Sequence, residues 1–336
     1  MDASRALVLS TVLALYYPFC AAKVQPTAAP WDAPLAELWQ SPNGTAADGL
    51  YSGPIATRDL FNGPWGKQHA PDPRAIYTFV ERKQHGTNPG ITVRDSQGRE
   101  WHVKQPPHTD QGAEGPIEVV LSRVLSAVGY HQPPVYYLPV VRVKDEHGTH
   151  IEPGGRFRLS DKSIKVLDEW SWQQNPFVGM RPYQGLLVIL AMFNSSDIKN
   201  ENNALYEVKE PGNGPKHWYV VRDLGTALGE TGRLAPLRGN PTIFASQPFI
   251  LDVRDGLVRF NYRGWHQELF HQIAPLDLAF ACDLMEQLTD QQWSDAFRAG
   301  GVSPAEANRF IAALHKRIAE ARKASRQPAL VTTSSP

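Results

Sequence analysis

The chain has 336 residues, of which 42% are hydrophobic and 20% are charged, and it contains nine tryptophans. This composition is sufficient for a buried core, which excludes a fully disordered chain. The 34 Lys and Arg residues balance 34 Asp and Glu residues, so no basic excess points to a nucleic-acid partner. With Cys20 and Cys282 as its two cysteines, the chain has neither a disulfide framework nor a cysteine-based zinc site.

Residues 1–22 are typical of an export signal. Arg5 precedes an apolar run over residues 6–19, and the small residues Ala21 and Ala22 follow it. The run is shorter than the roughly 20 residues that cross a bilayer. We therefore expect an exported protein (periplasmic, secreted or in the secretory-pathway lumen) whose mature chain has no integral membrane domain. A buried N-terminal helix and an uncleaved anchor are the alternatives.

The next two segments are predicted to be an irregular arm and a sheet-containing lobe. Residues 23–73 are rich in Pro, Ala and Gly, and Trp39, Phe61 and Trp65 are expected to pack this arm against the main domain. Residues 74–180 begin with three strand patterns, at 77–80, 91–94 and 101–104, separated by turn sequences. We interpret this part as an N-terminal lobe with an antiparallel sheet.

One helix belongs to this first lobe. Pro116 suits its first turn, apolar residues recur at the helical period, and Gly129 ends the run. A further strand is expected over 135–141. Residues 77–143 therefore have the predicted order strand, strand, strand, helix, strand.

Residues 181–325 are predicted to form a mainly helical lobe, with a disordered tail over 326–336. The apolar stretch 183–193 indicates a buried helix, and residues 276–288 indicate another. Strand patterns at 204–208 and 217–221 flank a turn. Thr289 with Gln292, and Ser303 with Glu306, are typical of N-terminal helix caps.

A polar loop follows the buried helix and carries the residues best suited to chemistry. Asp197 and Asn202 are five positions apart, with Lys199 between them, and Asp223-Leu224-Gly225 follows the strand pair. Phosphoryl transfer needs a carboxylate facing the attacking hydroxyl, oxygen ligands for Mg²⁺ and a cation on the phosphates. Lys104, at the end of the third strand, supplies such a cation, and Glu118 supplies a partner for it. Alternatively, the same residues have no role in chemistry and serve as turn caps or as solvated surface charges.

The pattern Asp-x-Lys-x-x-Asn followed by Asp-Leu-Gly resembles the catalytic loop and metal-binding motif of the protein-kinase-like fold. The resemblance spans residues 75–325 and implies a two-lobed α+β fold that binds ATP with Mg²⁺ or Mn²⁺ in the cleft. It also implies roles for six residues. Asp197 would be the catalytic base, Lys199 would steady the transferring phosphate, Asn202 and Asp223 would bind the metal, and Lys104, held by Glu118, would contact the inner phosphates.

Several departures place the chain near the atypical branches, similar to HipA-like kinases or the secreted kinases of the secretory pathway. Ser195-Ser196 replace the usual His-Arg before the catalytic Asp, and no Ala-Pro-Glu follows Gly225. The first-strand loop offers Gly86 and Gly90 for phosphate contact but no Gly-x-Gly-x-x-Gly. Glu114 is a rival partner for Lys104, and we expect it to lie outside the helix.

The leading prediction is an exported atypical kinase that transfers the γ-phosphoryl group of a Mg-nucleotide to an acceptor hydroxyl. The acceptor is a protein, a sugar, a lipid headgroup or a small molecule. A pseudokinase that serves as a binding module is the first alternative, and an enzyme that transfers AMP on the same fold is the second. Because free ATP is scarce outside a cytoplasm, export also leaves open a ligand other than ATP.

Overall fold

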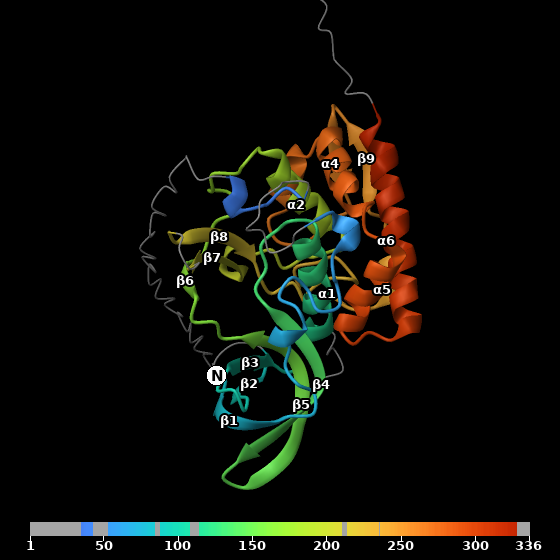
Figure 1. Ribbon diagram of the computed structural model, residues 1–336. Helices are drawn as coiled ribbons and strands as arrows, with labels where there is room; N and C mark the ends of the chain where they lie inside the picture. The colour runs from blue at the N-terminus through green and yellow to red at the C-terminus, as the bar shows by residue number, and fades with distance from the viewer. Residues whose placement is uncertain are drawn as a thin grey trace, which may run out of the picture.

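The chain folds into a mixed arrangement of helices and strands (Figure 1). The computed structural model describes residues 35–42, 53–84, 88–107, 114–209, 214–234 and 236–327. The strands are β1 (Ile76–Arg82), β2 (Gly90–Arg94), β3 (Glu100–Lys104), β4 (Val135–Asp145), β5 (Gly148–Leu159), β6 (Ile164–Asp168), β7 (Asn203–Val208), β8 (Lys216–Val221), β9 (Ile250–Arg254) and β10 (Leu257–Phe260). The α-helices are α1 (Glu114–Ala127), α2 (Arg181–Met192), α3 (Pro241–Ser246), α4 (Pro275–Met285), α5 (Asp290–Ala299) and α6 (Pro304–Ser325).

Strands β1–β5 form a closed barrel at one end of the molecule, in the order β1-β2-β3-β5-β4 (Figure 1). The expectation of an antiparallel sheet is therefore incomplete, because β1 and β4 pair in parallel and close the sheet. Closure gives the outer strands hydrogen-bonding partners. Trp101, Tyr77 and Phe157 are almost fully buried inside the barrel. Closure pairs strands far apart in the chain, and no local pattern predicts such a pairing.

Two strands and one helix boundary differ from the sequence predictions. Strands β5 and β6 fall within residues 148–168, where no strand was predicted. The run Pro153-Gly154-Gly155 inside β5 is typical of a turn, yet the strand continues through it because β4 pairs with it, and β3 pairs with the residues that follow from Arg156. Helix α1 begins at Glu114 and not at Pro116, so the prediction that Glu114 lies outside the helix is wrong. Pro116 fits the first turn because its missing N–H has no partner there.

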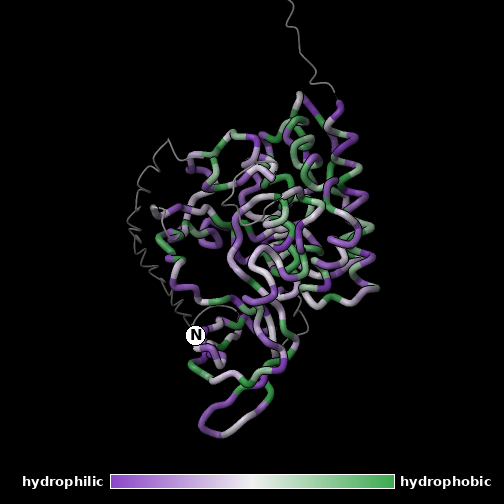
Figure 2. Tube along the Cα trace, in the orientation of Figure 1, coloured by the Kyte–Doolittle hydropathy of each residue, from purple (hydrophilic) through white to green (hydrophobic). Residues whose placement is uncertain are grey.

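The helices α2, α4 and α6 enclose the largest hydrophobic core. Residues 182–192 of α2 are all buried, which confirms the predicted buried helix. Figure 2 shows hydrophilic and hydrophobic residues alternating along α6 at the edge of the molecule, as expected for a helix with one buried face. The Thr289 and Gln292 side chains form the predicted capping box of α5, and Ser303 caps α6.

The N-terminal arm packs against the main domain through its three predicted aromatic residues. Trp39 contacts the ring of Phe280 on α4, and Trp65 is buried against Tyr136 of the barrel. Phe61 is 38% exposed, and the Arg298 guanidinium of α5 lies 4.0 Å from its ring centroid. The signal-like residues 1–22 and most of the predicted tail lie outside the described residues. Among the described residues, no helix has the length and apolar character needed to cross a membrane.

The predicted strand pair forms at β7 and β8, and β6 joins it in a three-stranded sheet of order β6-β7-β8. This sheet connects the end of the polar loop, at Asn202, to Asp223. Since Asn203 pairs with Val221 at the start of the hairpin, the two ends of the hairpin lie next to each other. The fold therefore brings the polar loop and the Asp-Leu-Gly segment together.

Candidate active site

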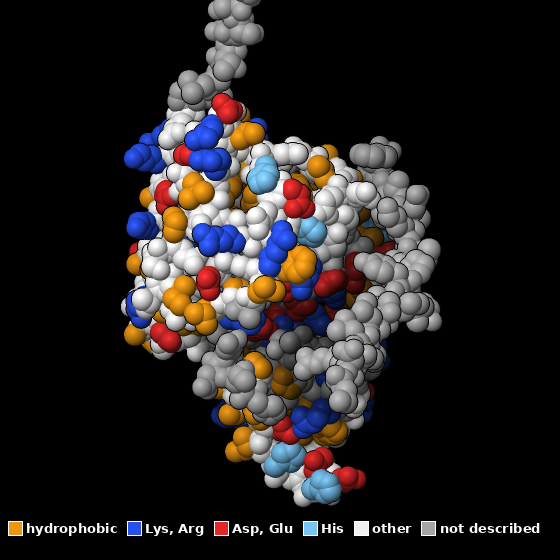
Figure 3. Space-filling model, turned by 180° about the vertical axis from the view of Figure 1, so that it is seen from behind, with side chains coloured by type: hydrophobic (Ala, Val, Ile, Leu, Met, Phe, Trp, Pro, Cys, Tyr) orange, Lys and Arg blue, Asp and Glu red, His pale blue; other side chains and the backbone are white. Residues whose placement is uncertain are grey.

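A cavity of about 780 Å³ lies where the barrel faces the polar loop and the segment after β8. Seen from behind, side chains of both charge signs gather in a hollow next to the barrel (Figure 3). Six of the eight predicted site residues line this cavity. They are Gly90, Lys104, Asp197, Lys199, Asn202 and Asp223. Gly86 lies outside the described residues.

Buried backbone hydrogen bonds hold the polar loop in place. Ser196 is fully buried, its N–H donates to the carbonyl of Thr226 at 3.1 Å, and its carbonyl accepts from the Trp265 N–H at 2.9 Å. These bonds fix the loop to the segment that follows Asp223. Ser195 and Ser196, the departures from the kinase pattern, therefore serve as structural residues of this loop.

Within the loop, the side chains of Asp197, Lys199 and Asn202 contact one another. The Lys199 Nζ lies 3.1 Å from Oδ1 of Asp197, and burial, which lowers the pKa of this lysine, is outweighed by Asp197, so the pKa is raised. The Asn202 Nδ2 donates to the Asp197 carbonyl at 2.6 Å and to its Oδ2 at 3.2 Å. These two bonds engage the amide nitrogen of Asn202, which leaves its Oδ1 as the atom available to a cation.

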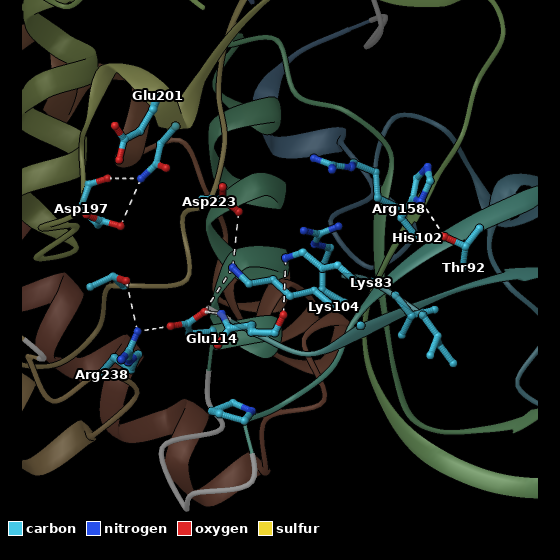
Figure 4. A pocket seen from close by; sticks show the side chains of 18 of the residues that line it. Lys83, Thr92, His102, Lys104, Glu114, Arg158, Asp197, Glu201, Asp223 and Arg238 are labelled. Carbon is cyan, nitrogen blue, oxygen red and sulfur yellow. Dashed lines mark hydrogen bonds and ion pairs between the residues drawn. The ribbon is translucent and has the colours of Figure 1, made fainter. Parts of the chain in front are cut away.

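Lys104 is surrounded by three carboxylates from two parts of the chain. Its Nζ lies 3.1 Å from Glu114 and 3.4 Å from Asp223 (Figure 4). It also lies 3.8 Å from Glu118. Burial alone would lower the pKa of Lys104, but Glu118, Asp223 and Glu114 outweigh it and hold the pKa above its ordinary value. The lysine is therefore charged, and it joins the barrel to the Asp-Leu-Gly segment.

Asp223 is held as an anion in a strained backbone position. Burial would raise the pKa of its carboxyl, but Lys104, Arg156 and Arg158 together lower it below its ordinary value. Its φ of +51° is uncommon for a residue with a side chain, and such strain often marks functional sites. The adjacent Gly225 packs so closely on helix α1 that a Cβ at this position would lie 2.7 Å from the carbonyl oxygen of Glu114.

Glu114 and Glu118 both hold Lys104, a role predicted for Glu118 alone. Glu118 lies behind the cavity wall, where it forms a 2.9 Å ion pair with the buried Arg156 in addition to its longer contact with Lys104. Glu114 lines the cavity and also contacts Arg238 and Asn88. It is therefore Glu114 that connects the first-strand loop, the barrel and the segment after Asp223.

Sequence reasoning missed several charged residues of the cavity. Arg156 and Arg158 project from β5, a strand that was not predicted, and His102 lies two residues before Lys104 on β3. The alternation Arg156-Phe157-Arg158 was the available signal, because alternate residues of a strand share a face. Arg238 follows Asp223 by 15 positions in an irregular segment and has no recognisable pattern around it.

The residues at one end of the cavity suit a magnesium ion bound together with phosphates. Mg²⁺ takes oxygen ligands, keeps several waters and typically uses one or two carboxylates plus phosphate oxygens. The ionised Asp223 carboxylate and the Asn202 Oδ1 are donors of this kind. Among the described residues, no group of three or more His, Cys, Asp or Glu side chains could hold a metal by itself. The donor set therefore fits a metal that phosphate helps to bind.

Comparisons with known proteins show a distant structural similarity but no family for this chain. No protein-family model and no curated protein matches the chain. Among solved structures, the chain is similar to the proinflammatory kinase CtkA of Helicobacter pylori, with 11% sequence identity and a TM-score of 0.44. The match covers 74% of this chain and 96% of that one. This similarity is distant and carries no inference about the function of this chain.

Proposed function

We propose that this chain is an exported atypical kinase with a two-lobed, kinase-like fold. It would transfer the γ-phosphoryl group of a Mg-nucleotide to an acceptor hydroxyl. The observation that carries the proposal is the meeting of Asp197, Asn202, Lys104 and Asp223 in one cavity. These residues come from β3, from the loop after α2 and from the end of β8. Turn-capping side chains and solvated charges have no reason to converge in this way.

Each residue has a role in this proposal that matches its surroundings. Asp197 accepts the proton of the attacking hydroxyl, and Lys199, 3.1 Å from it, places positive charge beside the transferring phosphate. Asn202 and Asp223 would hold the metal, which would neutralise charge on the phosphates. Lys104 contacts the inner phosphates, and Glu114 and Glu118 fix its position.

The proposal is tested by thermal unfolding of the chain with and without ATP and Mg²⁺ or Mn²⁺, beside the Asp223→Ala variant. Ligand at 100 times its Kd stabilises a protein by about 2.7 kcal/mol. For a domain of this size, this corresponds to a rise in Tm of roughly 2–4 °C. We expect a metal-dependent rise that the variant lacks.

The thermal shift, measured together with turnover of the donor, also distinguishes the alternatives. A rise without turnover of any donor would favour a pseudokinase, while release of pyrophosphate during turnover would favour AMP transfer. The absence of any metal-dependent rise would contradict the proposed function.

A further inference from the structure

Four cationic or ionisable side chains form a grid on the barrel face that borders the cavity. In the antiparallel pair β3 and β5, Lys104 lies opposite Arg156 and His102 lies opposite Arg158. Alternate strand residues share a face, so all four project to one side, whereas Val103 and Phe157 belong to the barrel interior. All four of the grid residues line the cavity. Their arrangement is therefore a property of the strand register.

The charge of this grid is balanced at one end only. Lys104 and Arg156 have the carboxylates of Glu114, Glu118 and Asp223 around them. In contrast, no hydrogen bond or ion pair joins the Arg158 side chain to another residue in the described part of the chain. Burial and the neighbouring Arg156 lower the pKa of Arg158 more than Tyr206 and Glu118 raise it. A buried arginine with no directly bonded carboxylate in the described part of the chain favours an anionic ligand at this end of the cavity.

His102 and its neighbours Thr92 and Glu81 also line this end of the cavity. Its Nδ1 lies 3.2 Å from the Thr92 hydroxyl, which also contacts Glu81 at 3.4 Å. Glu81 is exposed, so solvent screens its charge. Figure 4 shows His102 and Arg158 on the opposite side of Lys104 from Asp197. Two residues along a strand cover roughly 6.6 Å, so the grid extends the cationic surface by about that length beyond Lys104.

This end of the cavity offers little to an uncharged aromatic base. Binding sites for such groups are lined mainly by apolar and aromatic side chains. Ile91 and Val103 also line the cavity, but each is only 2% exposed and belongs to the barrel core, so the side chains that β2, β3 and β5 present there are mainly polar or charged. An adenine placed against His102 and Arg158 would leave the arginine without a counterion. A further phosphate would supply one through charge-assisted hydrogen bonds.

We propose that the cavity also binds a linear polyphosphate chain as a phosphoryl donor, with its reacting end near Asp223 and its far end on His102 and Arg158. The inference rests on the proposed function, since it uses the same transfer centre, and it adds to the nucleotide a second, more anionic donor that binds more tightly. The acceptor oxygen forms a bond to the terminal phosphorus, and the bridging P–O bond to the next phosphate breaks. The hydroxyl proton passes to Asp197, and the chain leaves one phosphate shorter.

The test compares the binding of linear inorganic triphosphate, a longer linear polyphosphate and ATP, each with Mg²⁺, to the full chain by calorimetry. Arg158→Gln removes the uncompensated charge without breaking an ion pair, and His102→Gln is a second variant of the same end. Arg254→Gln is the matched control, because this arginine is exposed on β9 away from the cavity. Asp223→Ala reports on the transfer centre itself.

We expect the longer polyphosphate to bind at least about tenfold more tightly than ATP. Arg158→Gln should remove about a factor of ten for the longer chain and change ATP binding by less than about twofold. Equal or tighter binding of ATP, or an Arg254→Gln effect as large as that of Arg158→Gln, would overturn the inference and leave the proposed function standing. If Asp223→Ala affects no ligand, the proposed function fails with it.

Discussion

The Nζ of Lys104 lies 3.1 Å from Oε2 of Glu114, one helical turn before Glu118 on the same helix. Residues four apart on a helix share a face, so both carboxylates reach the lysine. They differ in their other contacts, since Glu118 pairs with the buried Arg156 while Glu114 contacts Arg238 across the cavity. The two glutamates therefore contribute differently to stability and to ligand binding.

Replacing Glu118 by Gln should destabilise the fold strongly. The side chains of Glu118 and Arg156 are 6% and 5% exposed, so the change leaves a buried arginine without its carboxylate. Loss of one partner from a buried pair costs about 3 kcal/mol or more. Urea unfolding of the variant would measure this loss of free energy. Glu100→Gln, which alters a more exposed pair with Arg94, is the control and should lower the free energy of unfolding far less.

Replacing Gly225 by Ala should disturb both the fold and the site. The new Cβ would lie 2.7 Å from the Glu114 carbonyl oxygen, so the segment after Asp223 and the start of α1 must move apart. Overpacking of this kind typically costs about 1–3 kcal/mol. We expect a lower Tm together with weaker metal-dependent ligand binding. In Gly214→Ala the new Cβ would meet no atom of the described residues within 4 Å, so this variant should change neither, and equal behaviour of the two variants would contradict this packing argument.

Replacing Asp197 by Asn should separate binding from turnover. The two side chains have the same size, the amide oxygen can still accept from Lys199, and Asn202 keeps its bond to the backbone carbonyl of residue 197, so the loop should keep its shape. The general base is lost, for which a fall in rate of about 100-fold to 10,000-fold is typical. Rates of donor consumption and the ligand-induced rise in Tm would be measured on the same preparation. An unchanged rate would show that Asp197 does not act as the base.

His102 should make the unliganded fold less stable as the pH falls. Burial, followed by Arg158 and Arg156, lowers the pKa of His102 below its ordinary 6.5. The unfolded chain therefore takes up a proton near pH 6.5 that the folded chain resists. Stability should be complete above that pH and decrease as the pH falls through 6.5 toward the folded-state pKa. His102→Gln should flatten this part of the pH profile in chemical unfolding, and an identical slope in both proteins would contradict the assignment.

Local sequence patterns were sufficient for the elements whose signals lie within a few residues. The apolar stretch 183–193 predicted α2, the caps at Thr289 and Ser303 predicted the starts of α5 and α6, and strand patterns predicted β7 and β8. The spacing of Asp197 and Asn202, followed by Asp223, also identified residues that meet in one cavity. Each of these signals depends on backbone periodicity or on short-range hydrogen bonds.

The tertiary structure alone decided which charges meet. The position of Glu114 depends on where α1 begins and on its contact with Gly225, which lies more than a hundred residues later in the chain. The grid of His102, Lys104, Arg156 and Arg158 depends on the register between β3 and β5. A shift of one residue would turn the arginines into the barrel and Phe157 outward. Register is set by burial across the whole barrel, and for this reason no short stretch of sequence contains it.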